Sequence, residues 1–318
     1  MRAVVVHANG GPENLQLIDT DAQTPGTDQI AVAVTTAGVN YLDIYQRNGA
    51  VPAPFVAGVE GVGTVTAIGA GVDQGLLGRR VGWLSGAGSF AETLVLDATK
   101  VVEVPEDIST DDAVALLMQG ITAQYLATSA YQIGKDTTVL VHSGAGGVGR
   151  LLVQVARHLG ATVFATASTS EKRRIAVDAG ADHALEYDGF ADAVNEITQG
   201  RGVDVIYDGV GRDTVAAGFT CLAVRGTMVV IGAASGAPPA IEFPTLAVKS
   251  LSVIRPSVAH FTAGPGELTT RAADVFEWAR QGVITTEIAG RYPLADVARA
   301  QEDLSSRSLA GKLLVDIA

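Results

Sequence analysis

The strongest chemical signal in the sequence is a glycine-rich loop that could hold a phosphate group. It reads Gly144-Ala145-Gly146-Gly147-Val148-Gly149 and matches the pattern G-x-G-x-x-G. In this pattern the first glycine permits a tight turn, the second lets a pyrophosphate approach the backbone, and the third packs the following helix on the strand. The helix N-terminus then offers N–H groups to phosphate. The alternative, a glycine-rich turn without a ligand, is disfavoured because the loop lies between a predicted strand and a predicted helix.

The residues after the next predicted strand indicate which dinucleotide fits. A site for NAD has an Asp or Glu there, about 20 residues after the loop, which binds the ribose 2′-hydroxyl. Here the strand ends at Ser168, and the first acid is Glu171, inside the next predicted helix. Hydroxyl groups together with Lys172 and Arg173 suit a 2′-phosphate, so we expect NADPH as the cofactor. The alternative is that both bases only face solvent in the first helical turn.

The loop belongs to a segment in which predicted strands and helices alternate. Strands are predicted at 138–142, 162–167, 184–187, 203–208, 227–232 and 251–254, and helices at 147–159, 171–179 and 191–198. Such alternation is typical of an α/β fold with a doubly wound parallel sheet. We therefore predict a dinucleotide-binding Rossmann domain at residues 119–257.

The remaining sequence predicts a second, mostly β domain. Short β-like runs at 3–6, 30–36, 61–68 and 92–96 are separated by Gly, Pro and Asp, as in an antiparallel barrel or sandwich. Helical spacing is found at 42–47 and 111–126, and the C-terminal part adds helices at 268–281 and 294–304 and a strand at 312–317. A length of 318 residues suits two domains. We assign residues 1–118 and 258–318 to this second, catalytic domain.

Composition and charge exclude several classes of protein. Acidic residues outnumber basic ones, 34 to 22, which gives a formal charge of −12 and disfavours nucleic acid as a partner. Cys221 is the only cysteine, so neither an internal disulfide nor a Cys-based zinc site can form. The apolar stretches are shorter than the roughly 20 residues of a membrane span, and the first apolar run is too short for a signal peptide. We expect a cytoplasmic protein that does not bind membranes.

Several motifs together resemble a known family. They are Ala37-Gly38-Val39-Asn40 with Asp43, Arg47 and Gly49; Gly58 to Gly63; Gly82; the loop Gly144 to Gly149 with Gln154 and Arg157; Val210 to Thr214; and Arg255-Pro256-Ser257. Over essentially its whole length the chain resembles the medium-chain dehydrogenase/reductase superfamily, and within it the zinc-free quinone oxidoreductases of the zeta-crystallin type. The resemblance implies that the mostly β domain is a GroES-like barrel.

The chain departs from the zinc-dependent alcohol dehydrogenases of this superfamily at the metal positions. Those enzymes have a Cys where this chain has Asn40 and a His where it has Val59. The Cys-rich lobe for a structural zinc is also missing, and with five His and one Cys no cluster with zinc-ligand spacing remains. We therefore predict an enzyme that works without zinc.

The resemblance implies which residues bind the cofactor. Gly144, Gly146, Gly147, Val148 and Gly149 would lie at the pyrophosphate; Ser168, Lys172 and Tyr187 at the 2′-phosphate and adenosine; Gly211, Gly232 and Ala233 toward the nicotinamide; and Arg307 near the adenine. Two of these have simpler explanations. Tyr187 would then be a half-buried strand aromatic, and Arg307 a solvated charge at a helix end.

By resemblance, the substrate pocket is lined by Asn40, Asp43, Tyr45, Thr122 and Arg255. Asn40 and Tyr45 are the expected donors to the acceptor oxygen, on which negative charge develops during reduction. Alternatively, Tyr45 is a packing aromatic, and Asp43 and Arg255 form a structural ion pair. The donor of a proton to carbon, which an enone substrate would need, is not identified.

Other polar residues have structural interpretations. We expect His142 to be a buried structural histidine, Cys221 a core residue and Glu60 a polar anchor. Tyr207 and Asp208 end a predicted strand near the cofactor, where they either pack and shape the turn or contact the cofactor.

The expected activity is the NADPH-dependent reduction of quinones. The alternatives are reduction of an activated C=C bond in 2-alkenals or enones, and a cofactor-binding structural or regulatory protein of the crystallin type. The apolar run Leu251 to Ile254 is predicted to form a sheet edge. Because a bare apolar edge invites pairing with another chain, we expect a homodimer built on this strand. The rival interpretation is that the chain's own C-terminal helix covers the edge.

Overall fold

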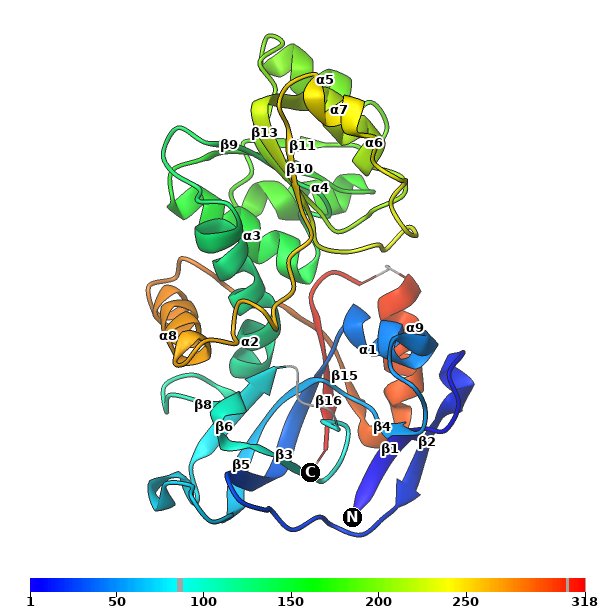
Figure 1. The fold of residues 1–318 in the computed structure, drawn as a ribbon, viewed down its shortest axis with the longest axis vertical. Coiled ribbons are helices and arrows are strands. Elements are labelled where there is room, and N and C mark those ends of the chain that lie inside the picture. Colours follow the sequence, from blue (N-terminus) through cyan, green and yellow to red (C-terminus); the bar gives the residue numbers. More distant parts are fainter. Residues whose placement is uncertain (85–87, 307–308, 318) are drawn as a thin grey trace. The chain divides into compact units, whose positions relative to one another are not determined.

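The computed structural model describes residues 1–84, 88–306 and 309–317, and the chain divides into two compact units (Figure 1). Unit 1 comprises Met1–Met118, Leu268–Ala272 and Thr286–Ala318. Unit 2 comprises Gln119–Glu267 and Ala273–Thr285.

Unit 2 contains a six-stranded sheet in which every pair of neighbours is parallel. Its strands are β9 (Thr138–Val141), β10 (Thr162–Thr166), β11 (His183–Leu185), β12 (Val203–Asp208), β13 (Leu222–Val230) and β14 (Ser252–Ile254). They lie in the order β11-β10-β9-β12-β13-β14, which is the 3-2-1-4-5-6 order of dinucleotide-binding folds. The predicted doubly wound parallel sheet is confirmed.

Helices connect the parallel strands and pack around them (Figure 1). They are α3 (Gly147–His158), α4 (Ser170–Asp178), α5 (Phe190–Ile197), α6 (Val215–Gly218) and α7 (Phe243–Ala247). The strand order reverses between β9 and β12. In open α/β sheets a ligand binds outside the carboxyl ends of the strands at this reversal. A ligand is therefore expected at the loops that follow β9 and β12.

Unit 1 is mostly β, with largely antiparallel pairing. A three-stranded sheet has the order β2-β1-β4, formed by β1 (Arg2–Val6), β2 (Leu15–Asp19) and β4 (Phe55–Val56). A seven-stranded sheet has the order β15-β16-β3-β5-β6-β8, with β7 also paired to β3. Its strands are β3 (Gln29–Val39), β5 (Glu60–Ile68), β6 (Arg80–Leu84), β7 (Thr93–Asp97), β8 (Val101–Glu103), β15 (Ile288–Pro293) and β16 (Lys312–Asp316). Only β15 and β16 pair in parallel within these described sheets.

Four further α-helices of the described residues do not connect strands of the six-stranded sheet. They are α1 (Tyr41–Tyr45), α2 (Thr110–Tyr125), α8 (Glu267–Arg280) and α9 (Val297–Ser306). Asn40 begins α1 with a capping box, because its side chain binds the N3 backbone while Asp43 binds the Asn40 backbone N–H. This cap fixes the direction in which the chain leaves β3.

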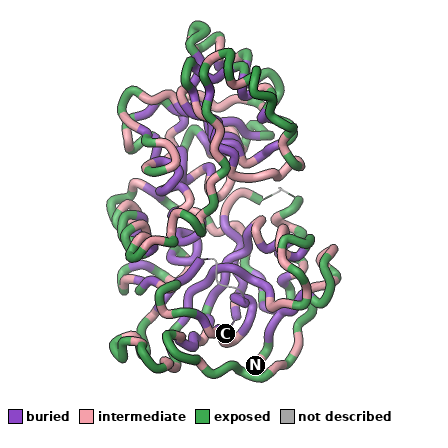
Figure 2. Tube along the Cα trace, in the orientation of Figure 1, coloured by how far each residue is buried: buried purple, intermediate pink, exposed green. Residues whose placement is uncertain are grey.

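Each unit has its own apolar core, and buried residues follow the strands of both (Figure 2). In unit 1, Trp83 and Phe90 are fully buried, and the Trp83 indole donates a hydrogen bond to Ser89 Oγ at 2.8 Å. In unit 2, Leu140 and Phe164 are buried at the centre of the parallel sheet. Their hydrophobic burial is the main stabilising contribution to each fold.

Some elements differ from the sequence-based prediction. Strands β2, β4, β6, β8 and β15 and helices α6 and α7 were not predicted. Strand β13 begins at Leu222 rather than at residue 227. Arg225 interrupts the sequence pattern there with a φ of 64°, and its N–H donates to the carbonyl of Lys249. Strand β14 lies at the edge of its sheet, as predicted.

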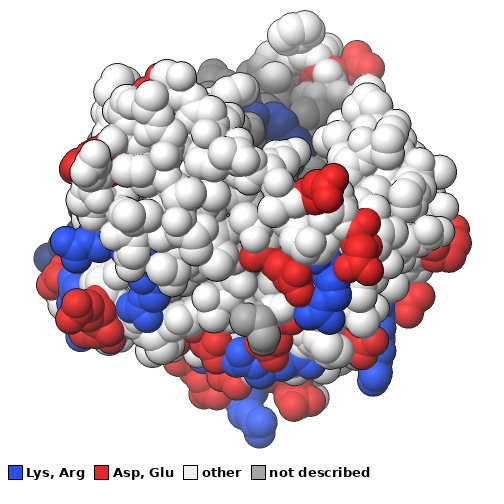
Figure 3. All heavy atoms as spheres, turned by 90° about the horizontal axis from the view of Figure 1, so that it is seen from below, with Lys and Arg blue, Asp and Glu red and all other residues white. Residues whose placement is uncertain are grey.

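The surface shown in Figure 3 has no continuous basic patch, since Lys and Arg side chains alternate there with Asp and Glu around a broad uncharged area. Among the described residues, no helix has both the length and the apolar character needed to cross a bilayer.

Candidate cofactor and substrate site

The glycine-rich loop connects β9 to α3, at the point where the sheet order reverses. The loop closes through a hydrogen bond from Gly146 N to Ser143 O at 2.8 Å, and Gly146 is the N-cap of α3. Since no side chain caps this helix, its first N–H groups point into the loop. A helix N-terminus in this position can bind a phosphate group.

The glycines of the loop are required by close packing. A Cβ on Gly144 would lie 2.7 Å from Ala165 Cβ, and a Cβ on Gly149 would overlap the carbonyl oxygen of Ser143. The left-handed backbone conformation in this loop belongs to Ser143, which has a φ of 57°. A non-glycine residue in this region is strained, and such strain is characteristic of functional loops.

Tyr187 lies beside the same loop. Its hydroxyl is 2.9 Å from Ser143 Oγ, and its side chain is half-buried. The tyrosine that follows β11 is therefore tied to the residue that starts the phosphate loop. This contact supports a place for Tyr187 near bound phosphate or ribose.

The end of β10 has the polar groups expected for a 2′-phosphate. Ser168 is exposed and Lys172 is half-buried in the first turn of α4. Thr169 caps this helix, since its Oγ1 accepts the Lys172 N–H at 3.1 Å. Arg173 instead forms an ion pair with Glu186 at 2.8 Å. Arg173 is thus engaged within the unit.

The turns that follow β12 and β13 pack closely on each other. A Cβ on Gly211, which has a φ of 93°, would lie 2.5 Å from the carbonyl oxygen of Gly236, and a Cβ on Gly232 would lie 2.6 Å from that of Gly209. Ala233 is half-buried in the second turn. Glycine is required at these positions because two backbone segments approach directly.

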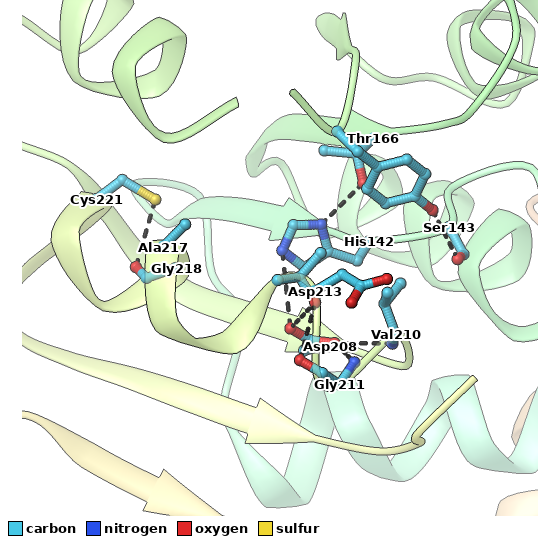
Figure 4. Close-up of polar contacts among 12 residues, drawn as sticks. His142, Ser143, Thr166, Asp208, Val210, Gly211, Asp213, Ala217, Gly218 and Cys221 are labelled. Atoms are coloured by element: carbon cyan, nitrogen blue, oxygen red, sulfur yellow. Dashed lines mark hydrogen bonds and ion pairs between the residues drawn. The ribbon is translucent and has the colours of Figure 1, made fainter. Parts of the chain in front are cut away.

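His142, at the end of β9, is buried and packed edge-on against Phe190. Its Nδ1 is 2.8 Å from Thr166 Oγ1 (Figure 4). Burial lowers the pKa of His142 to about 4, although the nearby Asp208 carboxylate acts in the opposite direction. The imidazole is therefore neutral near pH 7 and has a structural environment.

The predicted catalytic residues are divided between the two units. Asn40, Asp43 and Tyr45 belong to unit 1, and Thr122 and Arg255 to unit 2. Tyr45 and Thr122 are half-buried on α1 and α2. The exposed Arg255 follows β14, and its Nη1 donates to the carbonyl of Val230 at 3.0 Å. The alternative ion pair between Asp43 and Arg255 concerns both units and stays untested. Arg307 lies outside the described residues.

Asn40 is part of a buried polar cluster in unit 1. Its Nδ2 donates to Glu60 Oε1 at 2.8 Å and to the carbonyl of Gly38 at 3.4 Å, while its Oδ1 accepts from Lys312 Nζ at 3.0 Å. Lys312 and Glu60 form an ion pair in which the side chains are 3% and 0% exposed. Glu60 Oε2 also accepts the Met118 N–H at 3.1 Å. Glu60 is thus held by three donors.

Asp43 lies next to this cluster. Its Oδ2 accepts the Asn40 N–H at 2.7 Å, whereas Oδ1 has no hydrogen-bond partner among the described residues. Burial raises the pKa of Asp43 to about 7, with a further contribution from the Glu60 charge. The Asp43 carboxyl therefore keeps its proton to a higher pH than an exposed aspartate does.

The sequence interpretation missed two members of these clusters. Lys312 was assigned only to a strand, although a lysine at the start of an apolar strand is a recognisable signal because lysine is rarely buried without a partner. Ser143 was treated only as a neighbour of the glycine loop. Nothing in the sequence pattern indicates its left-handed backbone.

Cys221 does not have the environment of a reactive thiol. It is buried, and burial raises its pKa to about 12. In the part of the chain that the structure describes, no group of three or more His, Cys, Asp or Glu side chains could hold a metal ion.

Comparisons with known proteins agree with this architecture. A family described as "Alcohol dehydrogenase GroES-like domain" matches residues 26–106, and one described as "Zinc-binding dehydrogenase" matches residues 147–276. A 2-haloacrylate reductase from Burkholderia sp. is 36% identical over 98% of this chain and 98% of its own length.

Solved structures give the same result over the whole chain. The Escherichia coli quinone oxidoreductase complexed with NADPH is similar with a TM-score of 0.96 and 35% identity, covering 99% of this chain and 100% of that one. A mycobacterial protein complexed with NADPH has a TM-score of 0.95 and 41% identity, with coverages of 99% and 100%. The chain belongs to the medium-chain dehydrogenase/reductase superfamily and, within it, to the quinone oxidoreductase family.

Proposed function

We propose that this protein is an NADPH-dependent oxidoreductase that reduces quinones and needs no zinc. The observation that carries the cofactor assignment is the strand tip after the glycine loop. Ser168 is exposed where an NAD site would have an acid, and Lys172 lies in the adjacent helical turn. The relatives named as quinone oxidoreductases support the choice of substrate.

The residues of unit 2 fit the cofactor. The backbone N–H groups at the start of α3 would hold the pyrophosphate, and Ser168, Lys172 and Tyr187 the 2′-phosphate and ribose. Gly211 and Gly232 would allow the nicotinamide half to approach the backbone. When bound, NADPH supplies the hydride that reduces the acceptor. The protein contributes orientation and the electrostatic environment of the acceptor oxygen.

Asn40 and Tyr45 are the proposed donors to that oxygen. Within unit 1, Asn40 Nδ2 donates to Glu60 Oε1 and to the carbonyl of Gly38. The contact to Gly38 is the longer one, at 3.4 Å, and beyond the usual N–H···O distance. It is the contact that an acceptor oxygen could replace. The Lys312 and Glu60 contacts would keep the amide oriented meanwhile.

A second candidate function is the reduction of an electron-poor C=C bond. The relative named 2-haloacrylate reductase, which matches nearly the full length of this chain, favours it. This chemistry would use the same cofactor site but would also need a proton delivered to carbon. Asp43, with its pKa raised to about 7, is a buried reservoir for such a proton rather than a contact of the substrate.

A substrate screen with both cofactors tests these functions. NADPH and NADH are each combined with a panel of quinones and a panel of 2-haloacrylates and enals, with and without a strong chelator. Quinone turnover that prefers NADPH and survives the chelator is the expected result. Turnover of the alkenes alone would favour the second function. Tight NADPH binding without any turnover would favour a structural or regulatory protein.

We also propose a homodimer formed through β14. No strand pairs with the outer side of β14 in the part of the chain that the structure describes, and apolar side chains are exposed on β13 and in and just after α7: Val224 is 72%, Phe243 85% and Val248 79% exposed. Two-fold pairing of β14 with a second copy would cover both the strand edge and these apolar side chains. The expected cytoplasmic location stays a prediction that cell fractionation tests.

A further inference from the structure

Asp208 stands at the carboxyl end of β12, next to the reversal in strand order, and its side chain is fully buried. Its Oδ1 accepts the N–H groups of Val210 and Gly211 at 2.7 and 2.8 Å (Figure 4). Its Oδ2 accepts the Thr214 hydroxyl at 2.6 Å. One carboxylate thus binds three donors of the turn that follows β12. Such a buried charge needs these donors to remain in place.

Backbone hydrogen bonds also connect the turn after β12, which Asp208 holds, to the turn after β13. The Asp208 carbonyl accepts the Ile231 N–H at 2.7 Å, and the Val210 carbonyl accepts the Ser235 N–H at 2.8 Å. The close approach of Gly211 to the Gly236 carbonyl leaves no space between them. Because close-packed backbone segments move together, the position of Asp208 fixes both turns.

A second set of polar groups lies between Asp208 and the phosphate loop. His142 Nε2 lies 3.9 Å from Asp208 Oδ2, too far for a hydrogen bond, and His142 Nδ1 contacts Thr166 Oγ1. The Thr166 carbonyl accepts the N–H of Gly144, the first glycine of the loop, at 3.0 Å. The His142 N–H donates to the carbonyl of Tyr207, the residue before Asp208, at 3.0 Å. Hydrogen bonds thus link the carboxyl ends of β12, β9 and β10 to the loop at Gly144, although the Asp208 carboxylate makes no hydrogen bond to His142.

From this geometry we infer that Asp208 is a positioning residue for the nicotinamide half of the cofactor. It acts without touching the cofactor, by fixing the turns of Gly211 and Gly232 relative to the phosphate loop. The inference rests on the proposed NADPH site. It implies that Asp208 controls the nicotinamide half of the site and leaves binding of the adenosine half unchanged. A general role in stability would instead affect both halves alike.

The variant Asp208→Asn is nearly isosteric and separates these roles. The amide oxygen can still accept the Val210 and Gly211 N–H groups, but the amide nitrogen cannot accept the Thr214 hydroxyl. Thr214→Val removes the same contact from the other partner and serves as a second variant. Asp204→Asn is the matched control. Asp204 lies on the same strand, near its opposite end, and accepts the Thr138 N–H at 2.8 Å and Arg201 Nη2 at 2.6 Å.

The experiment measures four quantities for each variant. They are the Kd for 2′,5′-ADP, which probes the adenosine half, the Kd for NADPH, the kcat with a quinone, and the thermal unfolding midpoint. For Asp208→Asn we expect the 2′,5′-ADP Kd to stay within about twofold of wild type. Loss of one hydrogen bond to a charged group should weaken NADPH binding or lower kcat by about 10- to 100-fold. Thr214→Val should also weaken NADPH binding or lower kcat. Asp204→Asn should change neither the Kd for NADPH nor kcat.

Two results would overturn the inference. One is an equal loss of affinity for 2′,5′-ADP and NADPH in Asp208→Asn, which would mean that the whole unit is disturbed. The other is a fully wild-type variant. Failure of the proposed function looks different, because wild-type protein would then bind neither ligand. If it binds both but reduces no quinone, the two Kd values still decide the role of Asp208.

Discussion

The buried ion pair between Lys312 and Glu60 leads to a quantitative prediction about stability. Replacing Lys312 by Met keeps the length of the side chain and removes its charge. Glu60 then retains the donors Asn40 and Met118 but loses the only cation that the structure describes in contact with it. A buried carboxylate without its partner is strongly destabilising, typically by about 3–5 kcal/mol.

That free energy corresponds to a measurable shift in the unfolding midpoint. Globular proteins have an unfolding entropy of about 2.1 cal/mol/K per residue. For cooperative unfolding of 318 residues, this gives roughly 0.7 kcal/mol for each degree. Lys312→Met should therefore lower the midpoint by about 4–7 °C. Differential scanning calorimetry measures it directly.

The double variant Glu60→Gln/Lys312→Met tests the cause of the loss. Because it leaves no uncompensated charge, it should be more stable than Lys312→Met alone. Gly38→Ala should also lower the unfolding midpoint, because a Cβ there would push the ion pair apart. It would lie 2.6 Å from Lys312 Cε and closer still to Glu60 Oε1. Arg291→Met is the control. Arg291 pairs with Asp111 and Asp316 at the surface of the same unit, where an ion pair contributes about 0–1 kcal/mol.

The reasoning would be refuted by a Lys312→Met protein that melts within about one degree of wild type. It would also fail if the double variant were no more stable than the single one. In that case the loss would come from packing around the lysine stem rather than from the charge of Glu60.

Four further predictions follow from the described sites. The pKa of His142 is lowered to about 4 from about 6.5 in the unfolded chain. The contribution of His142 to stability is therefore complete above pH 6.5 and is lost as the pH falls toward 4. His142→Gln should reduce the difference in unfolding free energy between pH 7 and pH 4 by about 3 kcal/mol. Lys172→Ala should weaken NADPH binding by about 10- to 100-fold and spare NADH, as measured by fluorescence titration; equal losses would contradict the assignment of the 2′-phosphate site. Asn40→Ala and Tyr45→Phe should each lower kcat/KM for a quinone by roughly 10- to 100-fold, whereas abolished turnover with intact NADPH binding would show an obligatory catalyst. Light scattering should find a dimer that Val253→Lys converts to a monomer; a monomeric wild type would end the dimer proposal.

The parallel sheet could be predicted well from the sequence, and the physical reason is local. From β9 to β11 each strand is a short run followed by a helix that the sequence also predicts, so strand and helix alternate along the chain. The glycine loop lies directly between β9 and α3. Its position needed no long-range information. The left-handed conformation of Ser143 could not be predicted, because serine has no preference for it and the sequence pattern does not mark this position.

The polar cluster of unit 1 could not be predicted, because its members are far apart in the sequence. Lys312 and Glu60 are separated by 252 residues. They meet only because β16 pairs with β3 and β3 pairs with β5. The pairing register, which places Gly38 opposite both Glu60 and Leu314, is not visible in a hydrophobic pattern. The role of Lys312 therefore required the structure.

The position of β16 between β15 and β3 also has a consequence for synthesis on the ribosome. All residues of unit 2 are translated before Lys312 leaves the exit tunnel. Until then, β3 lacks one neighbour and Glu60 lacks its cation. A nascent chain stalled before residue 312 would expose an unpaired strand edge, which is the kind of surface that chaperones bind and that leads to aggregation.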